Sequence, residues 1–252
     1  MIDLSQPLPP AWTYPGDPAS SVDQYATHDA EGYRVSRLTT GTHAGTHVDA
    51  PAHTEPGGAT LGAFPVERFR WSAYRLDCTD LDAREPVPAQ RLPPADATDG
   101  VGLLAVHTGW DRHWGEDRYR DHPHLAPDAA RECARRGLDV AIDAPSVDPT
   151  PSAAETPLAT DAGVGGAGPD GPEAGRQSGD AETVVSGAHG AGGGPSESDD
   201  GLAAHHALLG DGRPIVENLT GLDATPERFE LWASPLALDA DAAPARAVAV
   251  VD

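Results

Sequence analysis

Short runs of apolar and β-branched residues recur along the chain and are separated by Gly, Pro and Asp. This spacing is typical of strands that are bounded by turns. The pattern therefore predicts mainly strands, and they cover residues 33–39, 73–79, 101–106, 140–143, 214–219, 229–236 and 246–251.

Two segments have the periodicity of helices instead. In residues 127–136 small apolar residues recur on one face, Asp128 favours the helix start, and Gly137 follows as a stop signal. A shorter helix is predicted over residues 202–209. Strands combined with a few helices predict an α/β fold with a mixed sheet.

Residues from about 151 to 200 break this pattern. Gly, Ala, Pro, Ser, Asp and Glu dominate the segment, and aromatic residues are missing from it. Such a composition cannot bury enough apolar surface to offset the entropy that is lost on ordering. We expect a disordered insertion within one domain that spans residues 1–252, because the segment after the insertion is too short to form its own core.

The charge of the chain narrows its possible partners. The sequence has 40 acidic and 17 basic residues, a formal net charge of −23, and every basic residue is Arg. A surface of this kind stays hydrated at high salt, which suggests a halophilic host, and it repels nucleic acid and anionic lipid. The chain shows neither the layout of a signal peptide nor a run near the roughly 20 apolar residues of a membrane span. We therefore expect a cytoplasmic protein that binds neither nucleic acid nor membranes.

The strongest chemical signal is the cluster His43, His47, Asp49 and His53. Nearby Gly, Pro and β-branched residues favour extended or looped backbone over helix. Residues two apart in an extended chain point to the same side, so His47 and Asp49 should face one point, and the flexible Gly45 would bring His43 round to them. Two imidazoles and a carboxylate suit Zn²⁺ or Mn²⁺ and leave a position open for water. A bound cation lowers the pKa of that water, which supplies hydroxide as a nucleophile.

Residues outside this group of three are further candidates. His53 is predicted either as a fourth ligand or as a general acid/base, because imidazole titrates near neutral pH. Taken alone, His205 and His206 would be a polar helix end, and Glu217 an exposed residue of an otherwise apolar strand. A carboxylate in such a strand is costly unless it is paired or binds a metal. Together with the upstream cluster, these residues are candidate ligands of a second metal.

Residues 43–53 resemble the signature H-x-G-T-H-x-D-x-P-x-H of the cyclase family, which includes bacterial kynurenine formamidases. Residues 14–17, 108–110, 143–148 and 215–219 also resemble that family, and the resemblance covers the chain apart from the segment at about 151–200. It implies a single α/β domain of the swivelling β/β/α type, usually a homodimer or larger homo-oligomer. The family's known reactions are hydrolysis of N-formylkynurenine, opening of isatin-type lactams and related acyl hydrolyses.

The resemblance also implies the roles of individual ligands. His43 and His47 would bind the first metal, and Asp49 would reach a second one. A histidine and a Glu twelve residues after it would complete the binuclear site, and this spacing selects His205 and Glu217. Glu217 would be the second bridging carboxylate.

The resemblance assigns His53, the last histidine of the signature, to proton transfer. Tyr14 stands where kynurenine formamidases have Trp in a motif that contacts the substrate, so an aryl-formamide would meet a changed surface. We therefore predict a metal-dependent amidohydrolase of a small amide, formamide or cyclic amide that uses two divalent metal ions, Zn or Mn. The alternative is a non-catalytic metal- or small-molecule-binding protein on the same fold, which would not need an acid/base at His53.

Overall fold

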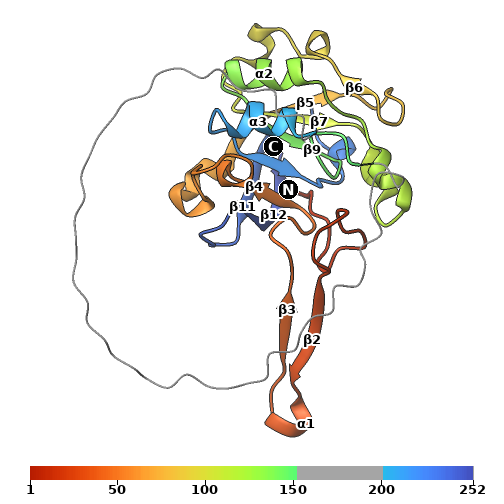
Figure 1. The fold of residues 1–252 in the computed structure, drawn as a ribbon, viewed down its shortest axis with the longest axis vertical. Coiled ribbons are helices and arrows are strands. Elements are labelled where there is room, and N and C mark those ends of the chain that lie inside the picture. The colour runs from red at the N-terminus through yellow and green to blue at the C-terminus, as the bar shows by residue number, and fades with distance from the viewer. Residues whose placement is uncertain (152–200, 252) are drawn as a thin grey trace, which may run out of the picture. The chain divides into compact units, whose positions relative to one another are not determined.

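A computed structural model of the protein describes residues 1–151 and 201–251. The insertion predicted at about 151–200 lies, apart from Pro151, outside the described residues. Among the described residues, eight strands form the main sheet (Figure 1). In sheet order they are β1 (Ile2–Asp3), β12 (Ala242–Val250), β11 (Arg228–Pro235), β5 (Arg70–Asp77), β7 (Leu103–His107), β9 (Asp139–Ile142), β10 (Ile215–Glu217) and β4 (His47–Asp49).

The main sheet is mixed and closes on itself. Strands β5, β7, β9 and β10 run parallel to one another, and all other pairings in the sheet are antiparallel. Strand β4 pairs with β10 on one side and with the start of β12 on the other, which gives the sheet the closure of a barrel. The prediction of an α/β fold with a mixed sheet is confirmed. The barrel-like closure of this sheet is a further feature that the sequence does not predict.

Two buried clusters account for the apolar runs in the parallel strands. In β7, Leu103 and Ala105 belong to a cluster inside the barrel, whereas Leu104 and Val106 belong to a cluster on its outer face. Because such strands are buried on both faces, they read as continuous apolar segments. The inner cluster is rich in Ala, since little space remains within a small barrel.

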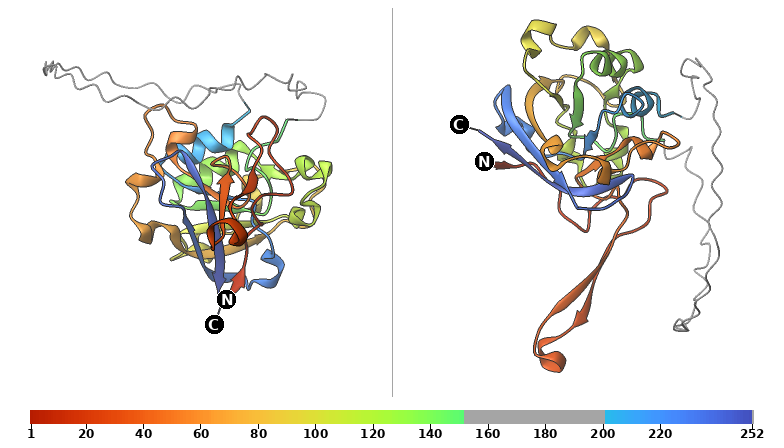
Figure 2. Two further views of the ribbon diagram at one scale, coloured as in Figure 1. Left: turned by 90° about the horizontal axis from the view of Figure 1, so that it is seen from below. Right: turned by 90° about the vertical axis from the view of Figure 1, so that its left-hand side faces the viewer.

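Helices α2 (Pro127–Arg135) and α3 (Ala203–Leu209) confirm both predicted helices. They pack on each other and cover the outer face of the parallel strands (Figures 1 and 2). The helix start at Pro127 and the left-handed Gly137 after its end are as the sequence predicts. None of the helices in the described ranges is long and apolar enough to cross a membrane.

The remaining elements are short or exposed. Strands β2 (Ser21–Ala26) and β3 (Val35–Thr39) form a ribbon that leads away from the main sheet, with α1 (His28–Glu31) at its end (Figures 1 and 2). All residues of β3 are exposed. The sequence predicts β3 but not β2, because apolar and polar residues do not alternate regularly along β2. The other elements are β6 (Pro86–Val87), β8 (His124–Leu125) and the 3₁₀ turns η1 (Pro51–His53), η2 (Leu61–Ala63), η3 (Val66–Phe69), η4 (Ala89–Arg91), η5 (Ala95–Thr98), η6 (Trp110–His113), η7 (Asp117–Asp121) and η8 (Leu222–Ala224).

Candidate metal centre

Strand β4 places His47 and Asp49 on one side of the chain, as their spacing predicts. The distance from His47 Nε2 to Asp49 Oδ1 is 3.3 Å. Gly45 has a φ of 64°, a left-handed conformation that Gly adopts without strain, and a Cβ there would come within 3.1 Å of Leu8 Cδ2. The chain turns at this point, so that His43 Nδ1 lies 2.9 Å from Asp49 Oδ1. The three residues predicted to share one metal therefore lie together.

Strand β10 brings Glu217 to the same place. It pairs antiparallel with β4, and Glu217 lies directly opposite His47 in the register. Residues opposite each other in such a pair point to the same face. Glu217 Oε2 is 3.5 Å from His47 Nε2, and Oε1 is 3.4 Å from His205 Nε2. Glu217 is buried between two histidines, so the exposed position considered for it is wrong.

Helix α3 contributes His205 and not His206. Asp148 accepts hydrogen bonds from the backbone N–H of Ala204 at 2.8 Å and from the backbone N–H of His205 at 2.9 Å. The same carboxylate lies 2.8 Å from His205 Nδ1, which leaves Nε2 facing Glu217. His206 Nδ1 instead lies 2.7 Å from Glu55. Asp148 thus positions both the start of the helix and the ring that enters the cluster.

The donor set fits divalent cations. Asp49 is fully buried, and among the residues that the structure describes neither of its oxygens makes a hydrogen bond, although ring nitrogens of His43, His47 and His205 lie 2.9, 3.3 and 3.9 Å away. An ionised carboxylate in this setting is costly unless a cation compensates it. Nitrogen and oxygen donors in this combination suit Zn²⁺ or Mn²⁺. Two groups, each with its ligand atoms within 4.8 Å of one another, share Asp49: His43, His47 and Asp49, and Asp49, His205 and Glu217.

The charges of the cluster shift the pKa values of its members in opposite directions. Burial favours the neutral histidines, but the carboxylate of Asp49 outweighs burial and raises the pKa of His43 and His47. Burial is likewise outweighed at His205, where two carboxylates raise the pKa to about 10. The histidines in turn hold the pKa of Asp49 well below its usual range and that of Glu217 at about 2, although burial alone would raise both.

Metal binding is therefore expected to release protons and to strengthen with pH. A histidine must lose a proton from the nitrogen that ligates. The pKa of His205, raised to about 10, keeps this proton bound at neutral pH, and the raised pKa values of His43 and His47 act in the same direction. The affinity for Zn²⁺ should rise about tenfold per pH unit for each proton displaced, and should level off only near the pKa of His205, at about 10. Calorimetric titration in buffers of different ionisation enthalpy measures this release. A pH-independent affinity would contradict the assignment.

A pocket opens beside the cluster, and Tyr14 is one of the residues that line it. The backbone N–H of Asp17 donates to the carbonyl of Tyr14 at 3.0 Å, Pro15 follows Tyr14, and Gly16 has a φ of 102°. These features are typical of a type II turn, which requires Gly at its third position. The turn brings both Tyr14 and Asp17 to the pocket, whereas the sequence alone points only to Tyr14.

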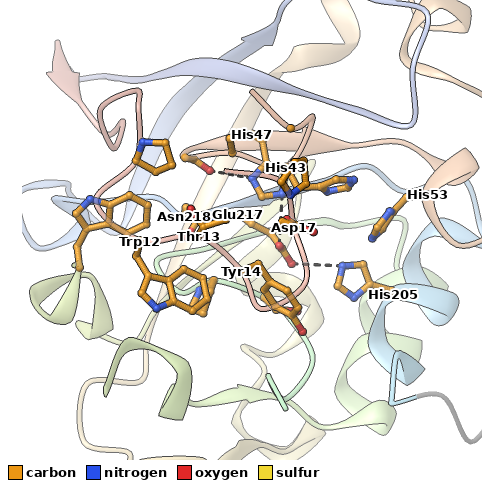
Figure 3. A pocket seen from close by; sticks show the side chains of 18 of the residues that line it. Trp12, Thr13, Tyr14, Asp17, His43, His47, His53, His205, Glu217 and Asn218 are labelled. Atoms are coloured by element: carbon orange, nitrogen blue, oxygen red, sulfur yellow. Dashed lines mark hydrogen bonds and ion pairs between the residues drawn. The ribbon is translucent and has the colours of Figure 1, made fainter. Parts of the chain in front are cut away.

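Aromatic side chains form another part of the pocket lining, here called the aromatic wall: Trp12, Tyr14 and Trp114. Ring centroids of Trp12 and Tyr14 lie 6.1 Å apart, and both Trp12 and Trp114 make edge contacts with the buried Tyr119. In Figure 3, Trp12 and His205 lie at opposite sides with Tyr14 between them. The cavity has a volume of about 190 Å³, which suits a small molecule better than a polymer.

His53 lies at the pocket beside the ligand groups. The chain turns through η1 after Pro51, as expected, and the His53 ring centroid is 4.1 Å from that of His43 and 5.4 Å from that of His205. His53 belongs to neither of the two groups that share Asp49. Burial lowers its pKa, so the ring is neutral at neutral pH and can accept a proton.

Several residues at the site were not selected from the sequence. Asp148 lies within a segment noted for its family resemblance, and Trp12 lies two residues before Tyr14, so both had a weak local signal. Asp17 belongs to the turn motif itself. Trp114 and Asp241 had none, because each reaches the site from a distant part of the chain.

Comparison with known proteins gives several similar hydrolases. The chain is 28% identical to the kynurenine formamidase of Bacillus thuringiensis (strain Al Hakam) and 29% identical to that of Bacillus cereus (strain ATCC 14579), in each case over 98% of this chain and 95% of the relative. Isatin hydrolase A from Labrenzia aggregata has the same fold, with a TM-score of 0.71, 18% identity, and coverage of 99% of this chain and 93% of that one. A predicted metal-dependent hydrolase from Bacillus stearothermophilus also has this fold, with a TM-score of 0.63 and 22% identity. The match covers 98% of this chain and 96% of that one.

The family itself follows from a match over more than half of the chain. The sequence model described as putative cyclase matches residues 2–149, which include the whole signature from His43 to His53. The resemblance predicted from that signature is confirmed, and the chain belongs to the cyclase family.

Proposed function

We propose that this chain is a metal-dependent hydrolase of a small aryl amide, formamide or cyclic amide. The observation that carries the proposal is the buried Asp49, whose carboxylate makes no hydrogen bond within the described part of the chain and is shared by two ligand groups beside a pocket with an aromatic wall. The kynurenine formamidases among its relatives and the isatin hydrolases of the same fold support an amide substrate.

The ligand residues have a defined part in this proposal. His43, His47 and Asp49 would hold one divalent cation, and His205 and Glu217 would hold a second one with Asp49. Bound cations of this kind lower the pKa of water and polarise a carbonyl oxygen. Backbone and side-chain partners keep the rings of His47 and His205 oriented before any ligand arrives.

The pocket residues would bind the substrate and move the proton. The aromatic wall would hold the ring of an aryl substrate with its carbonyl toward the ligand groups, and Trp12 and Trp114 would supply the indole surface that Tyr14 lacks. His53, neutral at neutral pH, would take a proton from the attacking water and return it to the nitrogen when the C–N bond breaks. Hydrolysis then yields a carboxylic acid and an amine.

The proposal is tested by turnover with defined metal content. Purified protein in molar NaCl should hydrolyse an N-formyl arylamine or an isatin-type lactam, lose this activity with a chelator, and regain it with Zn²⁺ or Mn²⁺. An alkyl formamide is the control, and the aryl substrate should be preferred by about tenfold, since an aromatic contact contributes about 1.5 kcal/mol beyond its area. Metal binding without hydrolysis of any of these substrates would favour the non-catalytic alternative.

A further inference from the structure

Asp241 brings a carboxylate to the metal centre from the turn before β12. In the β4–β12 pairing, Ala242 lies opposite Asp49. The backbone carbonyl of Asp241 accepts a 2.8 Å hydrogen bond from the N–H of Ala50. This register fixes the backbone of Asp241 next to the end of β4, so the position of its side chain follows from the sheet and not from a flexible loop.

One oxygen of Asp241 faces two histidines of the site. Oδ2 lies 2.9 Å from His43 Nε2, with hydrogen-bond geometry, and 3.7 Å from His53 Nδ1. The other ring nitrogen of His43, Nδ1, lies 2.9 Å from Asp49. A carboxylate accepts, so the hydrogen bond places a proton on Nε2 of His43 and leaves Nδ1 as the nitrogen that can ligate.

Such an outer partner is a shared feature of the ligand histidines. A hydrogen bond from the second ring nitrogen fixes the orientation and tautomer of a histidine, and loss of this partner commonly weakens metal binding or activity by 10- to 100-fold. Asp241 supplies this bond for His43 but differs from the other two partners, since it also reaches His53. The other two ligand histidines have outer partners of their own. His47 Nδ1 lies 2.8 Å from the carbonyl oxygen of Gly45, and His205 Nδ1 lies 2.8 Å from Asp148.

We propose that Asp241 is a positioning residue that couples the first ligand group to His53. Its hydrogen bond holds the ring of His43 with Nδ1 toward Asp49, and its approach to His53 Nδ1 orients the ring that transfers the proton. The second part of this assignment rests on the proposed function, whereas the first concerns metal binding alone.

The metal-binding part is tested with Asp241→Ala and Asp241→Asn, with Asp239→Asn as the matched control. Asp239 lies in the same turn and carries the same charge, but it accepts a hydrogen bond from Thr60. Competition with a chelator should show that Asp241→Ala binds Zn²⁺ about 10- to 100-fold more weakly, and the visible absorption spectrum of the Co²⁺-loaded variant should change. Asp241→Asn should lose less, because its amide oxygen still accepts from His43. Asp239→Asn should match the wild type in both measurements.

The coupling to His53 is tested by a double-mutant cycle at saturating metal. Asp241→Ala should lower kcat with little change in KM, and it should lower kcat no further when His53 is already Ala, because the two residues act as one unit. Multiplicative losses in the double variant would overturn the coupling.

Each part of the proposal can fail separately. Unchanged Zn²⁺ affinity and an unchanged Co²⁺ spectrum in Asp241→Ala would overturn the assignment to His43. If Asp241→Ala does not fold, the Zn²⁺ affinity and Co²⁺ spectrum of the isosteric Asp241→Asn are compared with those of Asp239→Asn. Equal values would overturn the assignment to His43. If the wild type binds metal but hydrolyses none of the substrates, the proposed function fails, and the affinity and spectrum of the variants still decide the role of Asp241.

Discussion

Asp49→Asn is expected to lose bound metal and to reduce turnover by at least about 10³-fold, since the several kcal/mol that a cation contributes to the transition state would be lost. The reason lies in the position of Asp49, which is common to both ligand groups and is buried with no hydrogen bond from any residue that the structure describes. The amide of Asn has no charge and a single oxygen, so it can serve neither group fully. Elemental analysis and kcat, measured on the same preparation, check the result.

The matched control for this variant is Glu55→Gln. Glu55 also pairs with a histidine, His206, but it lies outside both ligand groups. Its loss of charge should leave metal content unchanged. The melting temperature of each metal-free variant shows whether the fold survives, because Asp49 also compensates the charges of His43 and His47. An Asp49→Asn protein with two tightly bound metals would contradict the proposed centre.

The core of this centre could be predicted because its geometry is local. Side chains alternate along a strand whatever lies next to it, so the spacing of His47 and Asp49 is enough to place them on one side. Gly45 lies within the same segment, and a Gly adopts the left-handed conformation found there without strain. His53 likewise follows Pro51, which begins the 3₁₀ turn after the strand.

Other parts of the centre depend on sheet register, which the sequence does not show. Glu217 meets His47 only because β10 and β4 pair with these two residues opposite each other. Asp241 is held there by the pairing of β12 with β4. A shift of one residue in either pairing would turn these side chains to the other face. Through the family resemblance, the spacing along the chain indicates Glu217 as a metal ligand. The same spacing gives no reason to assign Asp241 to the metal centre.

The fold shows the same division between local and distant information. Helix α2 has a start signal, a stop signal and an apolar face within its own sequence, and its predicted bounds are nearly those observed. Strand β12 begins at Ala242 and not at residue 246 as predicted, because Pro244 lies inside it and Pro usually argues against a strand. The closure of the sheet through β4 cannot be read from β4, since only three residues form it.

His53→Ala is expected to keep its metal and to lower turnover by roughly 10² to 10⁴, the range for loss of a general acid/base. His53 lies outside both groups that share Asp49, so cations held by these two groups would keep all their ligands, although His53 forms a further candidate group with His43 and Asp241. Burial lowers the pKa of His53, so its ring is still neutral at the usual histidine value near 6.5. At saturating metal, wild-type kcat should therefore fall only when the pH drops below that value. Bound metal, kcat and the pH dependence of kcat are measured together.

The control for His53→Ala is His206→Ala, which removes a half-buried histidine that is hydrogen-bonded to Glu55. This variant should keep both its metal and most of its activity. Metal content then separates the two roles considered for His53, because removal of a ligand lowers affinity and activity together, whereas removal of a proton carrier lowers activity alone. A metal-depleted His53→Ala protein would make His53 a ligand, and a fully metallated and fully active one would place proton transfer elsewhere, with Asp17 at the pocket as the next group to change.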